Sequence, residues 1–230
     1  MSRSDLRRRL RLKLTAAALP RLLRPTPRPD LVRIGSAYGG WWVPESLLDA
    51  HSVCYLAGVG EDISFDVGVL DRFSCEVVSL DPTPRAIAYI EANAPEGLRF
   101  LPVGLGGTDR VARFYAPRNP HHVSHSITNL QGTSDYFEAE LRSLASLMNE
   151  LGHQRLDLLK MDIEGAEYEV LDEIMGSSTP PRIVCVEFDQ PASLKRIRSY
   201  VQRLRAAGYE LAKVEGFNAT FVGLRRDDSH

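Results

Sequence analysis

Cysteine is scarce in this chain, and the three that it has, Cys54, Cys75 and Cys185, lie in apolar runs. An odd number of thiols at this spacing forms neither a disulfide framework nor a zinc site, so we expect buried thiols in a reducing, cytoplasmic compartment. Long apolar runs are absent too, since none approaches the roughly 18–20 residues of a membrane span. The apolar stretch 14–20 follows a basic start, but it is short and Arg21 follows at once, which argues against a secretory signal.

Net charge is also small, at -2 over 230 residues, so the chain as a whole has no attraction for nucleic acid. This total hides an asymmetry. Residues 1–33 contain ten arginines and lysines against two aspartates, a net +8, which leaves -10 for the remainder. A basic head on an acidic body indicates an anionic membrane or partner for the head, or simply a solvated tail.

The basic head divides into two parts. Residues 4–19 predict a short helix, with Leu6, Leu10 and Leu14 on one face. This helix either lies on anionic lipid or packs on its own domain, and we favour the second because a narrow leucine stripe is common. Four prolines in residues 20–30 predict an extended linker. We therefore expect a basic arm and linker over 1–33, one domain over 34–224 and a polar tail over 225–230.

The most informative stretch is 156–171. Residues 156–161 are apolar apart from one lysine, as in a buried strand, and the apolar spacing after Gly165 predicts a helix. Asp162 and Glu164 lie between, at the carboxyl end of the strand, where ligands bind in open α/β sheets. If the chain is still extended there, the two side chains point the same way. Burying both is costly unless they bind something.

This stretch carries a family resemblance. The nine consecutive residues Leu159–Glu167, Leu-Lys-Met-Asp-Ile-Glu-Gly-Ala-Glu, resemble the signature of the FkbM-type methyltransferases, which use S-adenosylmethionine. The resemblance covers residues 34–224 and implies methylation of a hydroxyl oxygen, often on a sugar or natural product. The first-strand motif departs from the family pattern, because its acidic residues follow the glycines here instead of preceding them.

That motif follows a predicted first strand over 52–57. Gly58 and Gly60 allow a close backbone approach to a ligand. A dinucleotide fingerprint requires a third glycine where Ile63 stands, and the acidic Glu61 and Asp62 would repel a pyrophosphate. S-adenosylmethionine carries a cationic sulfonium and an ammonium group, so an acidic loop suits it and disfavours NAD.

Two further strand ends complete the predicted cofactor site. Asp81 ends a strand over 75–80, about 20 residues past the glycine turn, where a carboxylate can accept both ribose hydroxyls. Alternatively, it only caps the helix that Pro82 begins. A third strand over 98–103 leads to Gly104, near the nucleoside base or in a hairpin with the strand-like run 111–116. The predicted cofactor-binding residues are Gly58, Gly60, Glu61, Asp62, Asp81, Pro82, Gly104 and Asp162.

Three segments have open interpretations. The segment 34–44 is either a flap over the ligand or a hydrophobic plug at the edge or bottom of the sheet, and we slightly favour the flap because its run Tyr-Gly-Gly-Trp-Trp resembles the segment before the cofactor loop in some FkbM-like sequences. His121, His122 and His125 belong to a metal site, a substrate-side loop with one useful base, or a solvated loop. Residues 135–151 predict a helix, from the 4-3-4-3 spacing of Phe137, Leu141, Leu144, Met148 and Leu151.

The last part of the chain predicts the fold. A strand over 182–187 ends in Glu187 and Asp189, a helix over 194–204 follows, and two β runs over 209–215 and 220–224 form a hairpin. Such a hairpin is typical of the class I methyltransferases that the chain resembles. We expect a doubly wound α/β fold with a mostly parallel, seven-stranded, Rossmann-like sheet.

The expected chemistry is in-line methyl transfer to a hydroxyl oxygen. Alignment does most of the work, and a base takes the proton from the attacking hydroxyl. Candidate bases are Glu164, Asp162, His122 and His125. A Mg²⁺ held by Asp162, Glu164 and Glu187 or Asp189 is possible but not favoured. Alternatives are a non-catalytic nucleoside-binding scaffold and an RNA methyltransferase; the latter is disfavoured because only the N-terminal arm is basic.

Overall fold

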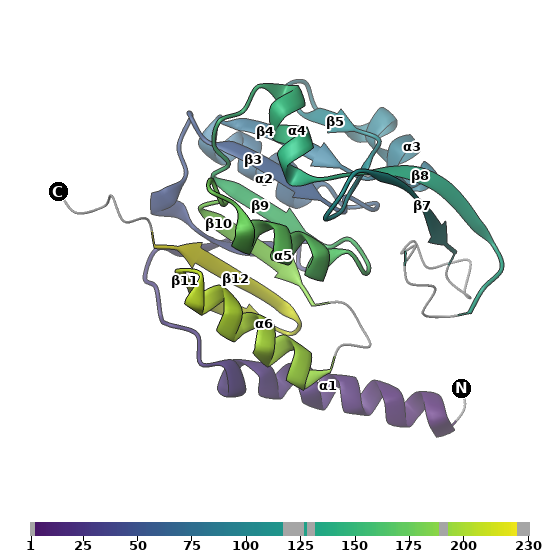
Figure 1. Cartoon of the computed structure of the whole chain (residues 1–230), viewed down its shortest axis with the longest axis vertical. Helices are drawn as coiled ribbons and strands as arrows, with labels where there is room; N and C mark the ends of the chain where they lie inside the picture. The colour runs from purple at the N-terminus through teal and green to yellow at the C-terminus, as the bar shows by residue number, and fades with distance from the viewer. Residues whose placement is uncertain (1–2, 117–126, 128–131, 189–192, 225–230) are drawn as a thin grey trace.

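A computed structural model describes residues 3–116, 127, 132–188 and 193–224; within residues 3–11 it describes only the side chain of Leu10. Its main sheet has the order β11-β12-β10-β9-β3-β4-β5 (Figure 1). The strands are β3 (Val53–Ala57), β4 (Glu76–Leu80), β5 (Arg99–Leu101), β9 (Leu158–Met161), β10 (Ile183–Glu187), β11 (Tyr209–Glu215) and β12 (Asn218–Gly223).

The pairing in this sheet confirms the predicted fold. Strands β5, β4, β3, β9 and β10 are parallel, and β12 pairs antiparallel with both β10 and β11. The hairpin turn is shorter than expected, because β12 already begins at Asn218. The parallel strands all end at the same edge, so the loops that follow them meet there.

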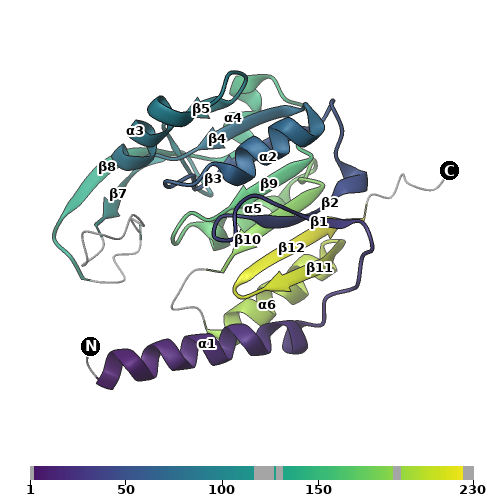
Figure 2. The same cartoon turned by 180° about the vertical axis from the view of Figure 1, so that it is seen from behind.

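Helices cover both faces of the sheet. On one face lie α4 (Leu144–Leu151), α5 (Glu167–Gly176) and α6 (Leu194–Ala206), whose apolar sides join one large core cluster (Figure 1). On the other face lie α2 (Ser64–Phe73) and a two-stranded ribbon, β1 (Leu31–Ile34) with β2 (Trp41–Pro44) (Figure 2). A further helix, α3 (Pro84–Asn93), connects β4 to β5, and a 3-10 turn, η1 (Glu45–Leu47), follows β2.

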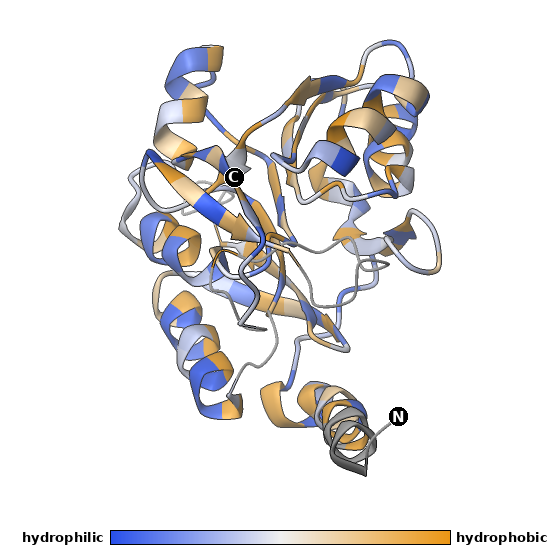
Figure 3. Ribbon diagram, turned by 90° about the vertical axis from the view of Figure 1, so that its right-hand side faces the viewer, coloured by the Kyte–Doolittle hydropathy of each residue, from blue (hydrophilic) through white to orange (hydrophobic). Residues whose placement is uncertain are grey.

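The side chains of the central strands alternate between these two cores. In β3, Tyr55 and Ala57 join the first cluster, whereas Cys54 and Leu56 join the second. Both faces of a central parallel strand are buried, so the strands are largely hydrophobic and the helices amphipathic, as the striping in Figure 3 shows. Among the described residues, none of the helices is both long and apolar enough to cross a membrane.

A small second sheet corrects one prediction. It has the order β6-β8-β7, with β6 (Gly104–Leu105), β7 (Arg110–Tyr115) and β8 (Tyr136–Arg142). The predicted helix over 135–151 is therefore wrong for residues 136–142, and only 144–151 are helical. Antiparallel pairing of β8 with β7, including the stacked rings of Phe114 and Phe137 at 5.3 Å, holds this segment extended.

The N-terminal region also differs from expectation. Helix α1 (Arg3–Leu23) is longer than the predicted 4–19 and continues through Pro20. Leu19 and Leu23 are buried in the first core cluster, whereas Leu10 and Leu14 of the predicted stripe are exposed. The favoured interpretation, that this helix packs on its own domain, is confirmed for the end of α1, and β1 begins at Leu31.

Candidate functional site

A cavity of about 290 Å³ lies beyond the carboxyl ends of the parallel strands. All eight residues predicted to bind a cofactor line it, together with Glu164 and Glu187. The small sheet adds Leu105, Phe114 and Leu141, and the β1–β2 ribbon adds Tyr38, Gly39 and Trp41. Segments from both ends of the chain thus surround one space, as the rule for ligands in open α/β sheets leads one to expect.

Gly58 sets the shape of the loop after β3. Its φ is +85°, and an added Cβ would lie 1.7 Å from the backbone oxygen of Asp162, so only glycine fits. Gly60 has φ +57°, but a Cβ there would meet nothing within 4 Å. The first glycine therefore allows two loops to pack together, and the second leaves open space at the cavity.

Asp81 ties this loop to the next one. One carboxylate oxygen accepts the N–H of Gly60 at 2.9 Å, and the other accepts the N–H and the hydroxyl of Thr83 at 2.8 and 2.6 Å. Thr83, whose hydroxyl accepts the N–H of Ala86, is the residue that caps α3. Asp81 is therefore not the helix cap, and it is a buried carboxylate that lines the cavity.

The other two acidic residues of the glycine loop are already paired. Glu61 forms an ion pair with Arg85, whose Nη2 donates to both carboxylate oxygens at 3.0 and 2.9 Å, and this pair offsets its charge. Asp62 accepts the hydroxyl of Ser36 at 2.6 Å and the N–H of Ser64 at 2.9 Å, and these hydrogen bonds outweigh burial, so the pKa of Asp62 lies below its usual range. Asp62 thus joins the glycine loop to the turn of the β1–β2 ribbon.

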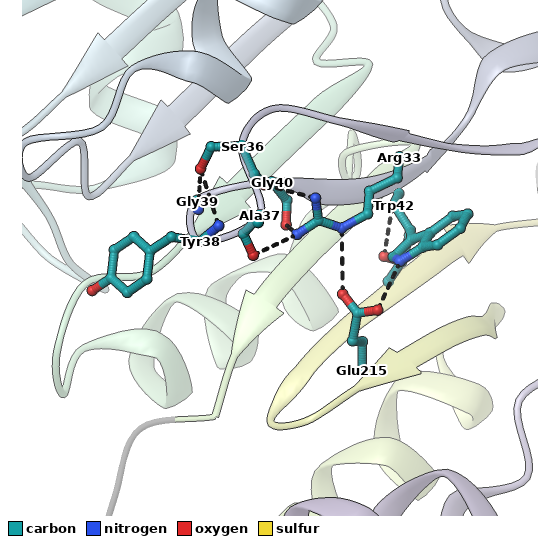
Figure 4. A network of polar contacts seen from close by, with 9 residues as sticks. Arg33, Ser36, Ala37, Tyr38, Gly39, Gly40, Trp42 and Glu215 are labelled. Atoms are coloured by element: carbon teal, nitrogen blue, oxygen red, sulfur yellow. Dashed lines mark hydrogen bonds and ion pairs between the residues drawn. The ribbon is translucent and has the colours of Figure 1, made fainter.

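That turn is held by a network around Arg33 (Figure 4). The guanidinium donates to the carbonyl oxygens of Ser36 at 2.6 Å, Ala37 at 3.1 Å and Gly40 at 3.3 Å, and pairs with Glu215 at 3.6 Å. The Ser36 hydroxyl accepts the N–H groups of Tyr38 and Gly39. The plug interpretation fits the strands, which bury Trp41 and Val43 on the sheet. The turn lies at the cavity, and its role as a flap stays a prediction.

The acidic turn after β9 is the most highly charged part of the cavity. The chain is not extended at Glu164, whose φ is +54°, yet Asp162 and Glu164 both line the cavity. Glu187 reaches the same space from β10. Burial, followed by the negative charge of Asp162 and a hydrogen bond with it, raises the pKa of Glu187.

Three buried charged groups lie close to the cavity, and their roles are not predicted by the sequence. Glu167, 1% exposed, accepts the N–H of Ile163 at 3.2 Å and of Gly165 at 3.0 Å. Lys160 is buried at the end of β9 and donates to the carbonyl of Gly58 at 2.5 Å. Asp66 is buried beside it and accepts the Ser79 hydroxyl. A lysine and an aspartate inside otherwise apolar segments were the available signals.

The remaining predicted residues are not placed in the site. His121, His122, His125 and Asp189 lie outside the described residues, so their roles stay predictions. Within the described part of the chain, no group of three or more histidine, cysteine, aspartate or glutamate side chains is arranged to hold a metal ion. The cysteines are buried free thiols, with Cys54 and Cys75 at 3.8 Å between sulfurs.

Comparison with solved structures finds distant likenesses. A Methanococcus jannaschii fibrillarin pre-rRNA processing protein is 14% identical, with 77% of this chain and 67% of that chain covered and a TM-score of 0.41. M. jannaschii TYW2 in complex with AdoMet is 10% identical, with 86% and 89% covered and a TM-score of 0.34. Likenesses this low carry no functional information.

Sequence comparison is more informative. The "Probable methyltransferase-like protein 24" of Homo sapiens is 27% identical over 122 residues, and that of Rattus norvegicus 26% over 152 residues. These matches cover 53% and 66% of this chain but only 27% and 35% of the relatives, so the chain corresponds to about a third or less of each. The family model described as "Methyltransferase FkbM domain" matches residues 57–211, the part that forms most of the sheet and the cavity. The chain belongs to the FkbM methyltransferase family.

Proposed function

We propose that this chain binds S-adenosylmethionine in the cavity and transfers its methyl group to a hydroxyl oxygen of a sugar, glycan or natural-product acceptor. The observation that supports the cofactor best is Asp81, a buried carboxylate at the end of β4 that faces the cavity beside the open space at Gly60. A carboxylate at this place suits the two hydroxyls of a ribose. The acidic lining suits a ligand that carries positive charge.

The residues divide into a cofactor side and an acceptor side. S-adenosylmethionine supplies an electrophilic methyl group on a sulfonium. In the proposal, Asp81 accepts the ribose hydroxyls and Asp162 attracts the positively charged methionine end, while Glu187, whose pKa is raised, lies beside Asp162 as a hydrogen-bonding neighbour. Lys160 and Glu167 hold this part of the cavity in shape, because both bond to the backbone of its loops.

The acceptor side requires a group that takes a proton. Glu164 lines the cavity on the turn after Asp162 and is the candidate base on geometric grounds. Tyr38 lines the cavity from the ribbon turn with 88% of its surface exposed. An exposed aromatic ring with carboxylates nearby suits a sugar, which offers an apolar ring face and several hydroxyls. This pairing supports a hydroxyl-rich acceptor.

Calorimetric titration tests the cofactor first. The purified chain is titrated with S-adenosylmethionine, S-adenosylhomocysteine and NAD, with and without Mg²⁺. We expect the two adenosyl ligands alone to bind, and Asp81→Ala to weaken them by at least about tenfold, since a hydrogen-bonded carboxylate is lost. Asp71→Ala, at an exposed aspartate on α2, is the matched control and keeps full affinity.

The outcomes separate the alternatives. A folded chain that binds none of the three ligands contradicts the proposal. Binding of the adenosyl ligands without methyl transfer to any hydroxyl compound supports the non-catalytic nucleoside-binding scaffold instead. Release of S-adenosylhomocysteine in the presence of hydroxyl compounds supports transfer, and the same screen identifies the acceptor.

A further inference from the structure

The outer face of α1 combines two kinds of side chain that do not usually share an exposed surface. Leu10 is 57% and Leu14 63% exposed, and Lys13, Ala17 and Arg21 are exposed beside them. At about 100° per residue these five positions fall on one stripe of the helix. The stripe therefore alternates large apolar and basic side chains along about three turns.

The rest of the domain does not cover this stripe. Among the side chains that the structure describes in α1, the fully buried ones are Leu19 and Leu23, close to its end. The same end is fixed by Arg205, which donates to the carbonyl oxygens of Leu23 and Arg24 at 2.8 and 3.0 Å. The helix is thus anchored at one end and presents its outer face along the edge of the molecule beside α6 (Figures 1 and 2).

The positive charge of the chain is concentrated in α1. The sequence of α1 contains seven arginines and lysines against one aspartate, a net +6, while the whole chain carries -2. The remainder therefore carries -8. A negatively charged surface attracts the helix and repels the body, so it would orient the molecule with α1 toward it.

We propose that the outer face of α1 docks on an anionic lipid surface. Both components of the stripe have a place there, because leucines enter the boundary between headgroups and acyl chains while lysines and arginines pair with lipid phosphates. A nucleic acid would use the basic residues but leave Leu10 and Leu14 in water, so it fits the stripe less well.

The first turns of α1 lie at the same edge of the sheet as the candidate site. Arg205 joins the ends of α6 and α1, and α6 begins on the side where β10 ends, so α1 extends from that anchored end toward the carboxyl edge of the sheet (Figures 1 and 2). The cavity lies at the same edge. The proposal concerns binding alone and does not depend on methyl transfer.

Vesicle sedimentation tests the proposal on the full chain. The probes are vesicles of phosphatidylcholine alone and vesicles in which about one third of the lipid is phosphatidylserine. We expect binding to the anionic vesicles only. The double variant Leu10→Ser with Leu14→Ser and the single variant Lys13→Glu should each lower the bound fraction, the double variant by about tenfold.

Matched controls make the result specific to α1. Val111→Ser removes an exposed apolar side chain from β7, and Arg99→Glu makes the same charge change at the far edge of the sheet; both should bind as the parent chain does. Thermal unfolding checks that all four variants are folded. No binding of the folded parent chain, equal binding by the leucine variant, or equal losses in the controls overturns the proposal. Binding to single-stranded RNA but not to anionic vesicles also overturns it.

Discussion

Gly58 and Gly60 lie in the same short loop, yet the structure makes different demands on them. A methyl group at Gly58 would overlap the backbone oxygen of Asp162, and its φ of +85° is unfavourable for any other residue. We expect Gly58→Ala to lower the free energy of unfolding by about 3 kcal/mol or more, because a loop must move or the chain must remain strained. Urea unfolding of the purified variant measures this.

Gly60→Ala is the matched control for that prediction. Its φ is also positive, but the methyl group meets no protein atom within 4 Å, so we expect a cost of about 1–2 kcal/mol from the backbone alone. Equal destabilisation by the two substitutions would show that the contact between the glycine loop and Asp162 is unimportant.

Glu187 makes stability depend on pH. Burial, and then the charge of Asp162, raise the pKa of Glu187 from 4.5 to about 9. Between these values the folded state holds a proton that the unfolded chain has lost, so stability is greatest at or below pH 4.5 with respect to this group and falls as pH rises toward 9. We expect the free energy of unfolding to fall by up to about 1.4 kcal/mol per pH unit from this group.

Unfolding curves across this pH range measure the effect. Glu187→Gln keeps a neutral side chain of the same shape and should flatten the fall in stability with pH. Glu91→Gln removes an exposed carboxyl group from α3 and should leave the fall unchanged. An unchanged slope in the Glu187 variant would refute the assignment.

Tyr38 distinguishes acceptor binding from cofactor binding. Its turn is held by Arg33, Ser36 and Asp62, while its ring is exposed at the cavity. We expect Tyr38→Ala to leave the affinity for S-adenosylmethionine unchanged and to lower kcat/KM about tenfold for a sugar acceptor, because a stacking surface is lost. Tyr38→Phe keeps the ring and should retain most activity. Loss of cofactor affinity in the alanine variant would place Tyr38 on the other side of the site.

At the scale of one turn, Glu167 is the residue that organises the acidic segment. Its buried carboxylate accepts two backbone N–H groups of residues 163–165. Glu167→Ala leaves these donors without this acceptor, so we expect a loss of about 2–3 kcal/mol in unfolding free energy and weaker cofactor binding. Glu169→Ala removes a half-exposed partner of Arg110 from the same helix and should cost less than about 1 kcal/mol. Denaturant unfolding compares the two variants, and similar costs would contradict this role.

The strands of the main sheet could be predicted from sequence because each one is a compact apolar run with a turn signal after it. The strand over residues 136–142 could not be predicted, because this segment fits both the helical period and the alternating period of a strand. Phe137 and Leu141 continue the helical spacing of Leu144 and Met148, but Phe137, Ala139 and Leu141 also alternate with two glutamates as in a strand. The partner strand β7 decides between them, and a long segment of chain separates its end from the start of β8.

The candidate site was predictable in part for a related reason. Residues at strand ends, such as Gly58, Asp81 and Asp162, follow from the rule that ligands bind at the carboxyl edge of the sheet. This rule does not predict the residues that hold those loops in place. The pairing of Glu61 with Arg85 and the bond from Ser36 to Asp62 join segments that are distant in the chain, and no local pattern predicts which side chains meet.

At the scale of the whole molecule, α1 has an exposed part and a buried part that its sequence does not separate. Leucines recur along the entire helix, yet Leu10 and Leu14 are exposed and Leu19 and Leu23 are buried. The difference arises from where the helix meets the domain, since Leu23 lies at the end of α1 that Arg205 of α6 holds, and the helix contacts β11. The outer face of the preceding turns can contact another surface, while the end of the helix belongs to the core of the domain.

Two adjacent leucines at the end of α1 test whether this end belongs to the core of the domain. Leu23 is 4% exposed and joins the first core cluster, whereas Leu22 is 45% exposed. We expect Leu23→Ala to lower the free energy of unfolding by about 2–4 kcal/mol, because it leaves a cavity among packed side chains. Leu22→Ala changes the same helix by the same atoms and should cost less than about 0.5 kcal/mol. Urea unfolding of both variants measures the difference. Equally small losses of unfolding free energy would contradict the packing of the end of α1 in the core.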